Sequence, residues 1–139
     1  VLKELKEERS IKTKYSSSTL QDERKSELYE KIIGLLEQKQ LHRNPEVSLS
    51  HVAEITGSNV AYISQVINEF SGSNFNGFIN DYRIQDALKI FSDFHNNKYT
   101  IEAIASEVGF KSKPSFNRAF KERTGVTPSL YKNTIQKEQ

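Results

Sequence analysis

Apolar residues recur at intervals of three and four along most of this chain, which is the spacing of one face of an α-helix. No stretch alternates apolar and polar residues with the period of two that is typical of a half-buried strand. The pattern therefore predicts an all-α protein. The first clearly amphipathic stretch runs from Leu20 to about Gln40, and its apolar stripe consists of Leu28, Ile32, Leu35 and Leu36, with Tyr29 and Ile33 beside them.

Residues that begin and end helices divide the rest of the chain. Asn44-Pro45 interrupts the first helical pattern. Residues suited to the N-cap position then precede five further apolar stripes: Ser48, Asn59, Asn74, Thr100 and Ser112. Glycines suited to end a helix follow four of these stripes: Gly57, Gly72, Gly109 and Gly125. The long helix that begins at Asn74 is instead expected to end near His95-Asn96-Asn97. Thr127-Pro128 predicts the start of a last turn, because Pro suits the first helical position.

The two ends of the chain lack this regularity. Residues 1–19 mix dense opposite charges with a Ser/Thr cluster, which favours a linker or a frayed helix end with little packing. Residues 133–139 are expected to form a tail. Residues 20–47 are expected to form a leading helix and its connection, and the apolar stripe of that helix must be buried against the rest of the chain or against a second chain. The chain begins at Val1 and contains no Met, so we expect it to be part of a longer protein.

Two pairs of the predicted helices repeat one another. SLSHVAEITGSNVAYISQVINEFSG aligns with TIEAIASEVGFKSKPSFNRAFKERTG, so that Ala53 and Ala105, like Gly57 and Gly109, are 52 positions apart. Each unit has a short helix with a small Ala, a turn containing Gly, a capping residue and a second amphipathic helix, which is a helix-turn-helix. The joining helix of roughly 20 residues would span about 30 Å. That length is close to the ~34 Å between successive major-groove faces of B-DNA, so one chain could supply two reading heads.

The second repeat resembles the C-terminal DNA-binding domain of the AraC/XylS family of transcription regulators. IASEVGFKSKPSFNRAFKERTGVTPSLYK carries the resemblance most strongly, with Gly109-Phe110, Ser112, Phe116, Arg118, Phe120-Lys121, Gly125, Pro128 and Tyr131 in their expected places. The first half agrees at Leu49, Ala53, Gly57, Ile63, Phe75, Ile79, Arg83 and Ala87. The resemblance implies a double helix-turn-helix domain over residues 48–132, with two units joined by a long helix. Residues 20–47 resemble an extra leading helix of members that are fused to upstream sensor modules.

Charge and composition agree with a partner that is a polyanion. Residues 111–139 hold seven basic and two acidic side chains, whereas residues 59–110 hold three basic and six acidic ones. The absence of Cys excludes disulfides, thiolate zinc sites and cysteine nucleophiles, and the three His lack the spacing of metal ligands. No apolar run approaches the roughly 18 residues of a membrane span, and none has the pattern of a signal peptide. Within its 139 residues the chain has room for one compact domain or two small ones.

Helix-turn-helix proteins read base edges with the solvent-facing, N-terminal side of the second helix of each unit. In the first unit that face consists of Val60, Ala61, Ser64, Gln65 and Asn68. The resemblance aligns Ser64 and Gln65 with positions that contact bases, and Gln can bond an adenine edge through two hydrogen bonds. Many family members have basic residues in this helix, whereas here no Lys or Arg lies between Asn59 and Phe70. Weak docking, or a neutral surface helix, is therefore an open alternative for the first unit.

The corresponding face of the second unit is basic. It consists of Lys111, Ser112, Lys113, Pro114, Asn117, Arg118 and Lys121. We expect Arg118 to pair with guanine O6 and N7 or to reach a phosphate, and we expect Lys111 and Lys121 to contact phosphates. Ordinary solvation is the alternative for the lysines.

Other residues have simpler interpretations. Phe110, Phe116 and Phe120 have helical spacing, which favours core packing over stacking on bases. The resemblance implies a structural, ion-pairing role for Arg83. The tyrosines, carboxylates, Ser and His form no triad or other arrangement that catalysis requires, and no Gly-rich phosphate loop follows a strand, so we expect no enzyme activity.

The sequence thus predicts the DNA-binding output domain of a transcriptional regulator that uses no cofactor. The expected partners are double-stranded DNA and an upstream sensor module in the intact protein. RNA polymerase, and a second copy bound through regions outside 48–132, are open alternatives, and activation and repression are both compatible with these residues. The expected location is the cytoplasm, with a membrane tether through an upstream module as a further alternative. The rival hypothesis is a helical protein-interaction domain that docks through the Leu28–Leu36 helix.

Overall fold

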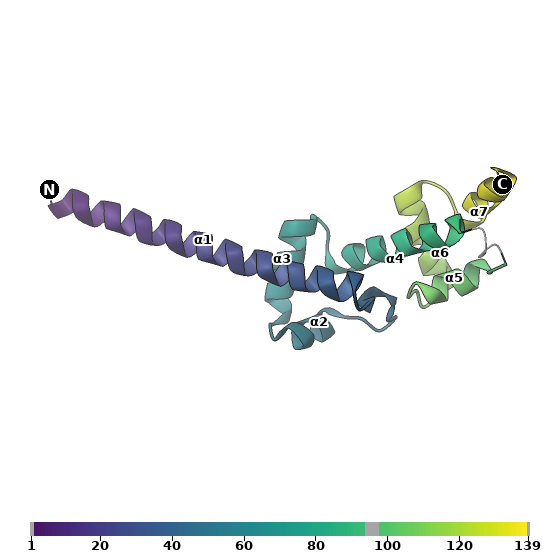
Figure 1. The fold of residues 1–139 in the computed structure, drawn as a ribbon, viewed down its shortest axis with the longest axis horizontal. Coiled ribbons are helices and arrows are strands. Elements are labelled where there is room, and N and C mark those ends of the chain that lie inside the picture. Colours follow the sequence, from purple (N-terminus) through teal and green to yellow (C-terminus); the bar gives the residue numbers. More distant parts are fainter. Residues whose placement is uncertain (1, 94–97, 139) are drawn as a thin grey trace.

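The computed structural model describes residues 2–93 and 98–138, and the side chains of residues 19–93 and 98–136. Within these residues the chain is helical and contains no strand, which confirms the prediction of an all-α fold. Figure 1 shows a long first helix that leads into a chain of shorter ones. In order, the elements are α1 (Leu2–Glu37), the 3-10 helix η1 (Leu41–Arg43), α2 (Leu49–Thr56), α3 (Val60–Ser71), α4 (Phe75–Ser92), α5 (Ile101–Glu107), α6 (Lys113–Thr124) and α7 (Pro128–Glu138). No helix in the described part of the chain combines the length and the apolar character that a bilayer crossing requires.

The first helix begins earlier than the sequence pattern indicates. Residues 1–19 are predicted as a linker or a frayed helix end, with the amphipathic helix starting at Leu20, whereas α1 starts at Leu2 and runs unbroken for 36 residues. The Ser/Thr cluster does not end the helix, because residues 2–19 contain neither Gly nor Pro and are rich in Leu, Glu, Lys and Arg, which are good helix formers. The N-terminal part of α1 projects away from the rest of the molecule in Figure 1. The expectation of little packing concerns side chains outside the described set and stays a prediction.

The helix boundaries from α2 onward follow the local signals. Each of the five predicted N-cap side chains accepts a hydrogen bond from a backbone N–H three residues further on: Ser48, Asn59, Asn74, Thr100 and Ser112. Gly57, Gly72 and Gly125 occupy left-handed C-cap positions. The long helix α4 ends at Ser92, before the predicted closing segment, which at His95-Asn96-Asn97 lies outside the described residues.

Each helix-turn-helix unit has its own apolar core. The first core contains Val52 and Ala53 of α2, the fully buried side chains of α3, and two residues of α1, Ile32 and Leu36, that are each 1% exposed. The stripe of the leading helix is therefore buried largely against its own chain, which confirms that alternative. The second core is built on α4, α5 and α6, and it includes the three phenylalanines predicted to pack there: Phe110, Phe116 and Phe120.

The helix α4 belongs to both cores. Its N-terminal half contributes Phe78 and Ile79 to the first core, and its C-terminal half contributes Ile84, Ala87 and Phe91 to the second. The helix has 18 residues. At about 1.5 Å per residue it is roughly 27 Å long, slightly shorter than the span expected from the sequence.

A dense joint connects the two units near the middle of α4. Arg83 donates hydrogen bonds to the backbone oxygens of His42 (2.7 Å) and Asn44 (3.2 Å), and its guanidinium lies 5.4 Å from the centre of the Phe110 ring. Arg83 has a structural role, as predicted, but within the described part of the chain it bonds backbone oxygens and not the carboxylate that an ion pair would require. The backbone carbonyls after α1 take the place of a carboxylate, and burial lowers the pKa of Arg83.

Two ion-pair groups complete this joint. The buried side chain of His42 contacts the Asp86 carboxylate at 2.6 Å through Nε2, and Arg43 donates to the same carboxylate at 3.0 Å. Arg43 also reaches Glu107 of α5 at 3.2 Å. Arg123 of α6 pairs with Asp81 and donates to the backbone oxygen of Gly77 at 3.0 Å. Both partners belong to α4, so these contacts also connect α6 to α4.

The last helix corrects the prediction of a tail. Residues 133–139 are predicted as a tail after a short turn, whereas α7 extends from Pro128 to Glu138 and has 11 residues. Ile135 follows Tyr131 by one helical turn, and both pack against the second core. The continued apolar stripe, with no Gly or Pro after Pro128, explains why the helix does not end earlier.

Candidate nucleic-acid interface

The outward face of α3 matches the face predicted for reading bases. Ile63, Val66 and Ile67 are fully buried, so the residues between them point to solvent. Val60 is 43% exposed, and Ser64 is half-buried. The other members of the predicted face are exposed: Ala61, Gln65 and Asn68. Whether these residues touch DNA stays a prediction.

Gln65 on this face is part of a short chain of polar contacts that reaches α1. Its amide nitrogen Nε2 donates to Glu69 Oε1 at 3.0 Å. Lys25 Nζ of α1 lies 3.3 Å from Oε1 and 3.2 Å from Oε2 of the same carboxylate. The pKa of Glu69 lies below its ordinary value, because the hydrogen bonds from Gln65 and then from Lys25 stabilise the charged form.

The same region of α1 and α3 is hollowed at the surface. A cavity of about 480 Å³ is lined by Gln21, Arg24, Lys25, Tyr62 and Gln65. The basic side chains absent from α3 itself are thus supplied beside it by α1. Sequence patterns did not point to Lys25 or Glu69, because the two are 44 positions apart and neither belongs to an apolar stripe.

The predicted face of α6 is also exposed and is richer in charge. Lys111, Ser112, Lys113, Pro114, Arg118 and Lys121 are exposed, and Asn117 is half-buried. Ser112 has a structural task, since its Oγ accepts from the backbone N–H of Ser115 at 3.3 Å and so caps α6. Phe116, Ala119 and Phe120 are buried on the opposite side of the helix.

The cations of the second unit differ in what they contact. Lys111 Nζ lies 3.1 Å from Glu46, and Lys113 Nζ lies 2.9 Å from Glu102. The Lys113 hydrogen bond lowers the pKa of Glu102. All four side chains are well exposed, and exposed pairs of this kind are weak, so phosphates can replace the carboxylates.

Arg118 and Lys121 form the charged centre of this face. Within the described part of the chain, neither side chain has a hydrogen-bond or ion-pair partner. Both extend from the exposed side of α6, one helical turn apart or less. They are therefore able to bind an incoming anion without first breaking a contact within the protein.

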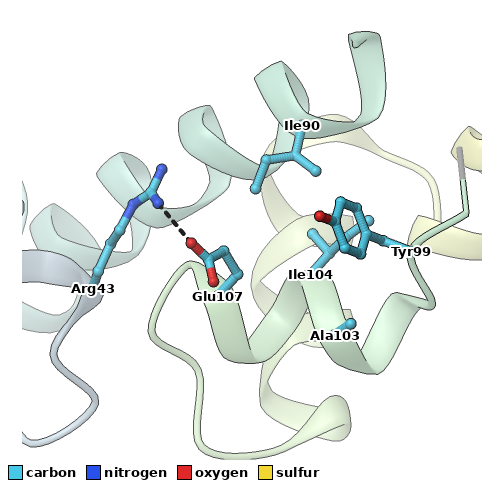
Figure 2. Close-up of a pocket in the computed structure, with 6 residues that line it drawn as sticks. All are labelled: Arg43, Ile90, Tyr99, Ala103, Ile104 and Glu107. Atoms are coloured by element: carbon cyan, nitrogen blue, oxygen red, sulfur yellow. Dashed lines mark hydrogen bonds and ion pairs between the residues drawn. The ribbon is translucent and has the colours of Figure 1, made fainter. Parts of the chain in front are cut away.

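A separate hollow lies between α4 and α5 and is drawn in Figure 2. It has a volume of about 320 Å³ and is lined by Arg43, Ile90, Tyr99, Ala103, Ile104 and Glu107. Figure 2 shows the Arg43–Glu107 ion pair at one side and the Tyr99 ring facing Ile90 and Ile104 at the other. None of its residues belongs to the predicted reading faces.

Two half-buried tyrosines, Tyr29 and Tyr82, pack against other aromatic rings. The Tyr29 ring stacks on Phe70 at 5.0 Å, and the Tyr82 ring meets Phe78 edge-on at 5.5 Å. Burial raises the pKa of both hydroxyls, so they stay neutral. Among the described residues, no group of three or more His, Asp or Glu side chains is arranged to hold a metal ion.

Comparison with known proteins identifies the double unit. A helix-turn-helix domain family matches residues 52–134, which is more than half of the chain. This chain belongs to the AraC-type helix-turn-helix family. The resemblance found in the sequence is thereby confirmed, and the family is one of transcriptional regulators and not an enzyme class.

AraC-type relatives are found in bacteria. An uncharacterized HTH-type transcriptional regulator of Staphylococcus aureus (strain COL) is 36% identical over 93 residues, which are 67% of this chain and 12% of the relative. The regulator YobQ of Bacillus subtilis, also uncharacterized, is 26% identical over 98 residues, or 70% of this chain and 39% of the relative. The chain thus spans about an eighth of the length of the staphylococcal relatives that it matches.

Solved AraC-type domains have the same architecture. The C-terminal domain of AraT, a response regulator from Geobacillus stearothermophilus, gives a TM-score of 0.61 at 25% identity and covers 69% of this chain and 79% of its own. The DNA-binding domain of AdpA, solved with a target DNA, gives 0.68 at 17% identity, with 81% and 95% covered. At that identity the likeness to AdpA concerns the fold alone.

Proposed function

We propose that this AraC-type domain binds double-stranded DNA in a sequence-specific way through α3 and α6, as the output domain of a transcriptional regulator. The observation that carries the proposal is that two helix-turn-helix units present exposed second helices from the two ends of one continuous helix, α4. The roughly 27 Å length of α4 suits successive major-groove faces, which lie about 34 Å apart. The solved complex of the similar AdpA domain with its target DNA supports this function.

The two units have different tasks in this proposal. The second unit supplies most of the electrostatic attraction, with Lys111, Lys113 and Lys121 on phosphates and Arg118 on a guanine edge or a phosphate. The capping end of α6, with Ser112, Pro114 and Asn117, lies against the DNA backbone. The first unit reads bases by hydrogen bonds and apolar contacts through Val60, Ala61, Ser64, Gln65 and Asn68. No catalytic step is part of this function.

The intact protein is proposed to be controlled by an upstream sensor module. The similar AraT domain comes from a response regulator, and the staphylococcal relatives are much longer than this chain. Dimerisation is assigned to regions outside residues 48–132, because one domain already holds two reading heads. RNA polymerase is a further proposed partner, the cytoplasm is the proposed location, and a membrane tether through an upstream module belongs to the same proposal.

The apolar face that the rival hypothesis of a protein-interaction domain requires is largely covered by the first core. It requires the apolar stripe of the Leu28–Leu36 helix, and Ile32 and Leu36 are each 1% exposed within the first core. Leu28 packs against the same core. A partner protein therefore could not reach Ile32 and Leu36 without separating α1 from the first unit.

Selection from random duplexes followed by a salt series tests the proposal. The chain should enrich a defined duplex sequence, and its affinity for that duplex should fall linearly on a log–log plot as salt rises, because bound phosphates release counterions. A scrambled duplex of the same length is the control, and it should bind more weakly. Failure to enrich any sequence, or an affinity that does not change with salt, would contradict the proposal.

A further inference from the structure

The contact between Gln65 and Glu69 fixes which way the Gln65 amide faces. An ionised carboxylate can only accept hydrogen bonds, so the Gln65 atom that lies 3.0 Å from Glu69 Oε1 must be the amide nitrogen. A glutamine amide without such a partner can turn over and exchange its nitrogen and oxygen. Here the amide keeps one N–H on Glu69, and no described residue contacts its oxygen or its second N–H, on a side chain that is exposed.

This orientation suits adenine better than guanine. In the major groove adenine offers an N6 donor beside its N7 acceptor, which the free oxygen and the free N–H of Gln65 can meet together. Guanine offers two acceptors, O6 and N7. The Gln65 oxygen would face O6 without a proton between them, and one of the two N–H groups is already used by Glu69.

Lys25 of α1 offsets the negative charge of the Glu69 carboxylate, which would otherwise repel DNA phosphates from α3. The helix α3 contains no Lys or Arg that could offset the negative charge of Glu69. Lys25 contacts both carboxylate oxygens, and its side chain is only 17% exposed. One turn further along α1, the Tyr29 ring stacks on Phe70, the neighbour of Glu69, so α1 and α3 are in contact next to the Lys25–Glu69 pair.

We infer that Glu69 and Lys25 are positioning residues that set the base preference of Gln65 by fixing its amide with the oxygen outward, so that the reading head of the first unit is completed by α1. This inference rests on the proposed function. A contact between residues four apart on a helix could also serve only to stabilise that helix. The two roles differ in one measurable respect, because a purely stabilising contact would leave the choice of base unchanged.

The test uses the selected duplex with the base pair read by Gln65 changed to each of the other three pairs. That pair is the one at which Gln65→Ala lowers discrimination. The native domain should prefer adenine over guanine there by roughly 5- to 150-fold, the range of one bidentate contact. Glu69→Gln keeps the size of the side chain but can both donate and accept, so it no longer fixes the amide, and the preference should fall below about threefold. Glu54→Gln, an exposed glutamate on α2, is the matched control and should keep the native preference.

Lys25 is tested in the same assay. Lys25→Gln should weaken binding to every duplex and reduce the adenine preference, because the Glu69 charge is then uncompensated and mobile. Lys25→Arg should restore both, and Lys31→Gln, at an exposed lysine on the same helix, should change neither the preference nor the fold measured by circular dichroism.

Each remaining outcome overturns a stated claim. A native adenine preference that survives Glu69→Gln would contradict the inference while leaving DNA binding intact. A Gln65→Ala variant with unchanged preference at every position would do the same, since Gln65 would then not read a base. A further fall in preference when Glu69→Gln is added to Gln65→Ala would show that Glu69 acts without Gln65. Absence of binding by the native domain would instead overturn the proposed function.

Discussion

The two helix-turn-helix units share one plan but differ in what surrounds their turns. Gly57 and Gly109 occupy equivalent places 52 positions apart, and both have positive φ angles, 70° and 109°. A Cβ on Gly57 would meet nothing within 4 Å. A Cβ on Gly109 would collide with the His42 carbonyl oxygen and would lie 2.9 Å from Arg83 Nε. The first turn therefore has open space at its glycine, whereas the second turn packs at its glycine against the residues that join the two units.

The reading faces of the two units differ in a similar way. The face of α3 is uncharged apart from Glu69, which Lys25 balances, and the face of α6 carries Arg118 and Lys121 without internal partners among the described residues. A repeated scaffold can thus divide the work of recognition. In the proposed function, the second copy provides most of the attraction to phosphates, and the first provides directional hydrogen bonds to bases.

The largest effect on stability is expected from replacing the glycine of each turn by alanine. Gly109→Ala should lower the free energy of unfolding by about 2–5 kcal/mol, because a left-handed conformation and a steric clash with backbone atoms add together. Gly57→Ala should cost about 1–2 kcal/mol, from the left-handed conformation alone. Urea denaturation followed by circular dichroism measures both. Equal losses in the two variants would contradict the proposed difference.

An intermediate effect is expected from removing the charged centre of α6. Arg118→Ala should weaken binding to the selected duplex by about 1–3 kcal/mol if Arg118 reads a base. Fluorescence anisotropy with the selected duplex and with single base-pair variants measures this loss and its dependence on sequence. Lys89→Ala, at an exposed lysine on α4, is the control for a general change in charge. Unchanged affinity in a folded Arg118→Ala variant would remove Arg118 from the interface.

A smaller effect is expected from acid acting on the joint between the units. Burial opposes ionisation of Asp86, but hydrogen bonds from His42 and Arg43 outweigh it, so the pKa of Asp86 lies below its usual 3.8. A carboxyl whose pKa is depressed in the folded protein contributes stability above its unfolded pKa, and this contribution is lost as the pH falls through the folded value.

Thermal melts between neutral pH and pH 3 test the role of Asp86. The melting temperature of the native chain should fall as the pH drops below the usual Asp range, and Asp86→Asn should start lower at neutral pH and fall less steeply. Asp22→Asn, at an exposed aspartate of α1, should keep the native pH dependence. If the melting temperature of Asp86→Asn falls with pH as steeply as that of the native chain, the acid sensitivity comes from other groups.

Local signals explain why most of the fold was predictable from the sequence. A cap such as Ser48 acts on an N–H three residues away, and Phe116 and Phe120 lie on the same face of one helix, so both features can be read from a short window. The sequence does not decide between a linker and a helix end for residues 2–19, because a Ser/Thr cluster resembles a linker when tertiary contacts are unknown. The continuation of α7 beyond a short turn was not predicted for a related reason, since the packing of Ile135 against the second core is a tertiary contact.

Long-range contacts explain what could not be predicted. Lys25 and Glu69 meet across 44 positions, and Arg83 bonds carbonyl oxygens that come from the connection after α1. Every residue has a backbone carbonyl, so the sequence does not show which of them accepts a hydrogen bond from Arg83. In the same way, nothing in the sequence distinguishes Lys25 from the other lysines of the charged helix α1. The candidate reading residues themselves were predicted, because the exposed face of a helix follows directly from its buried one.

The most direct test of the division of work is the dependence of DNA affinity on salt in two multiple variants. Replacing Lys111, Lys113 and Lys121 by Ala should reduce the slope of log affinity against log salt by about 2–3, because each phosphate-contacting lysine contributes about 1. Replacing Ser64, Gln65 and Asn68 by Ala should leave that slope unchanged and remove the sequence preference at the base pairs that α3 reads. Equal changes of slope in the two variants, or a slope that the lysine replacements do not alter, would contradict the account.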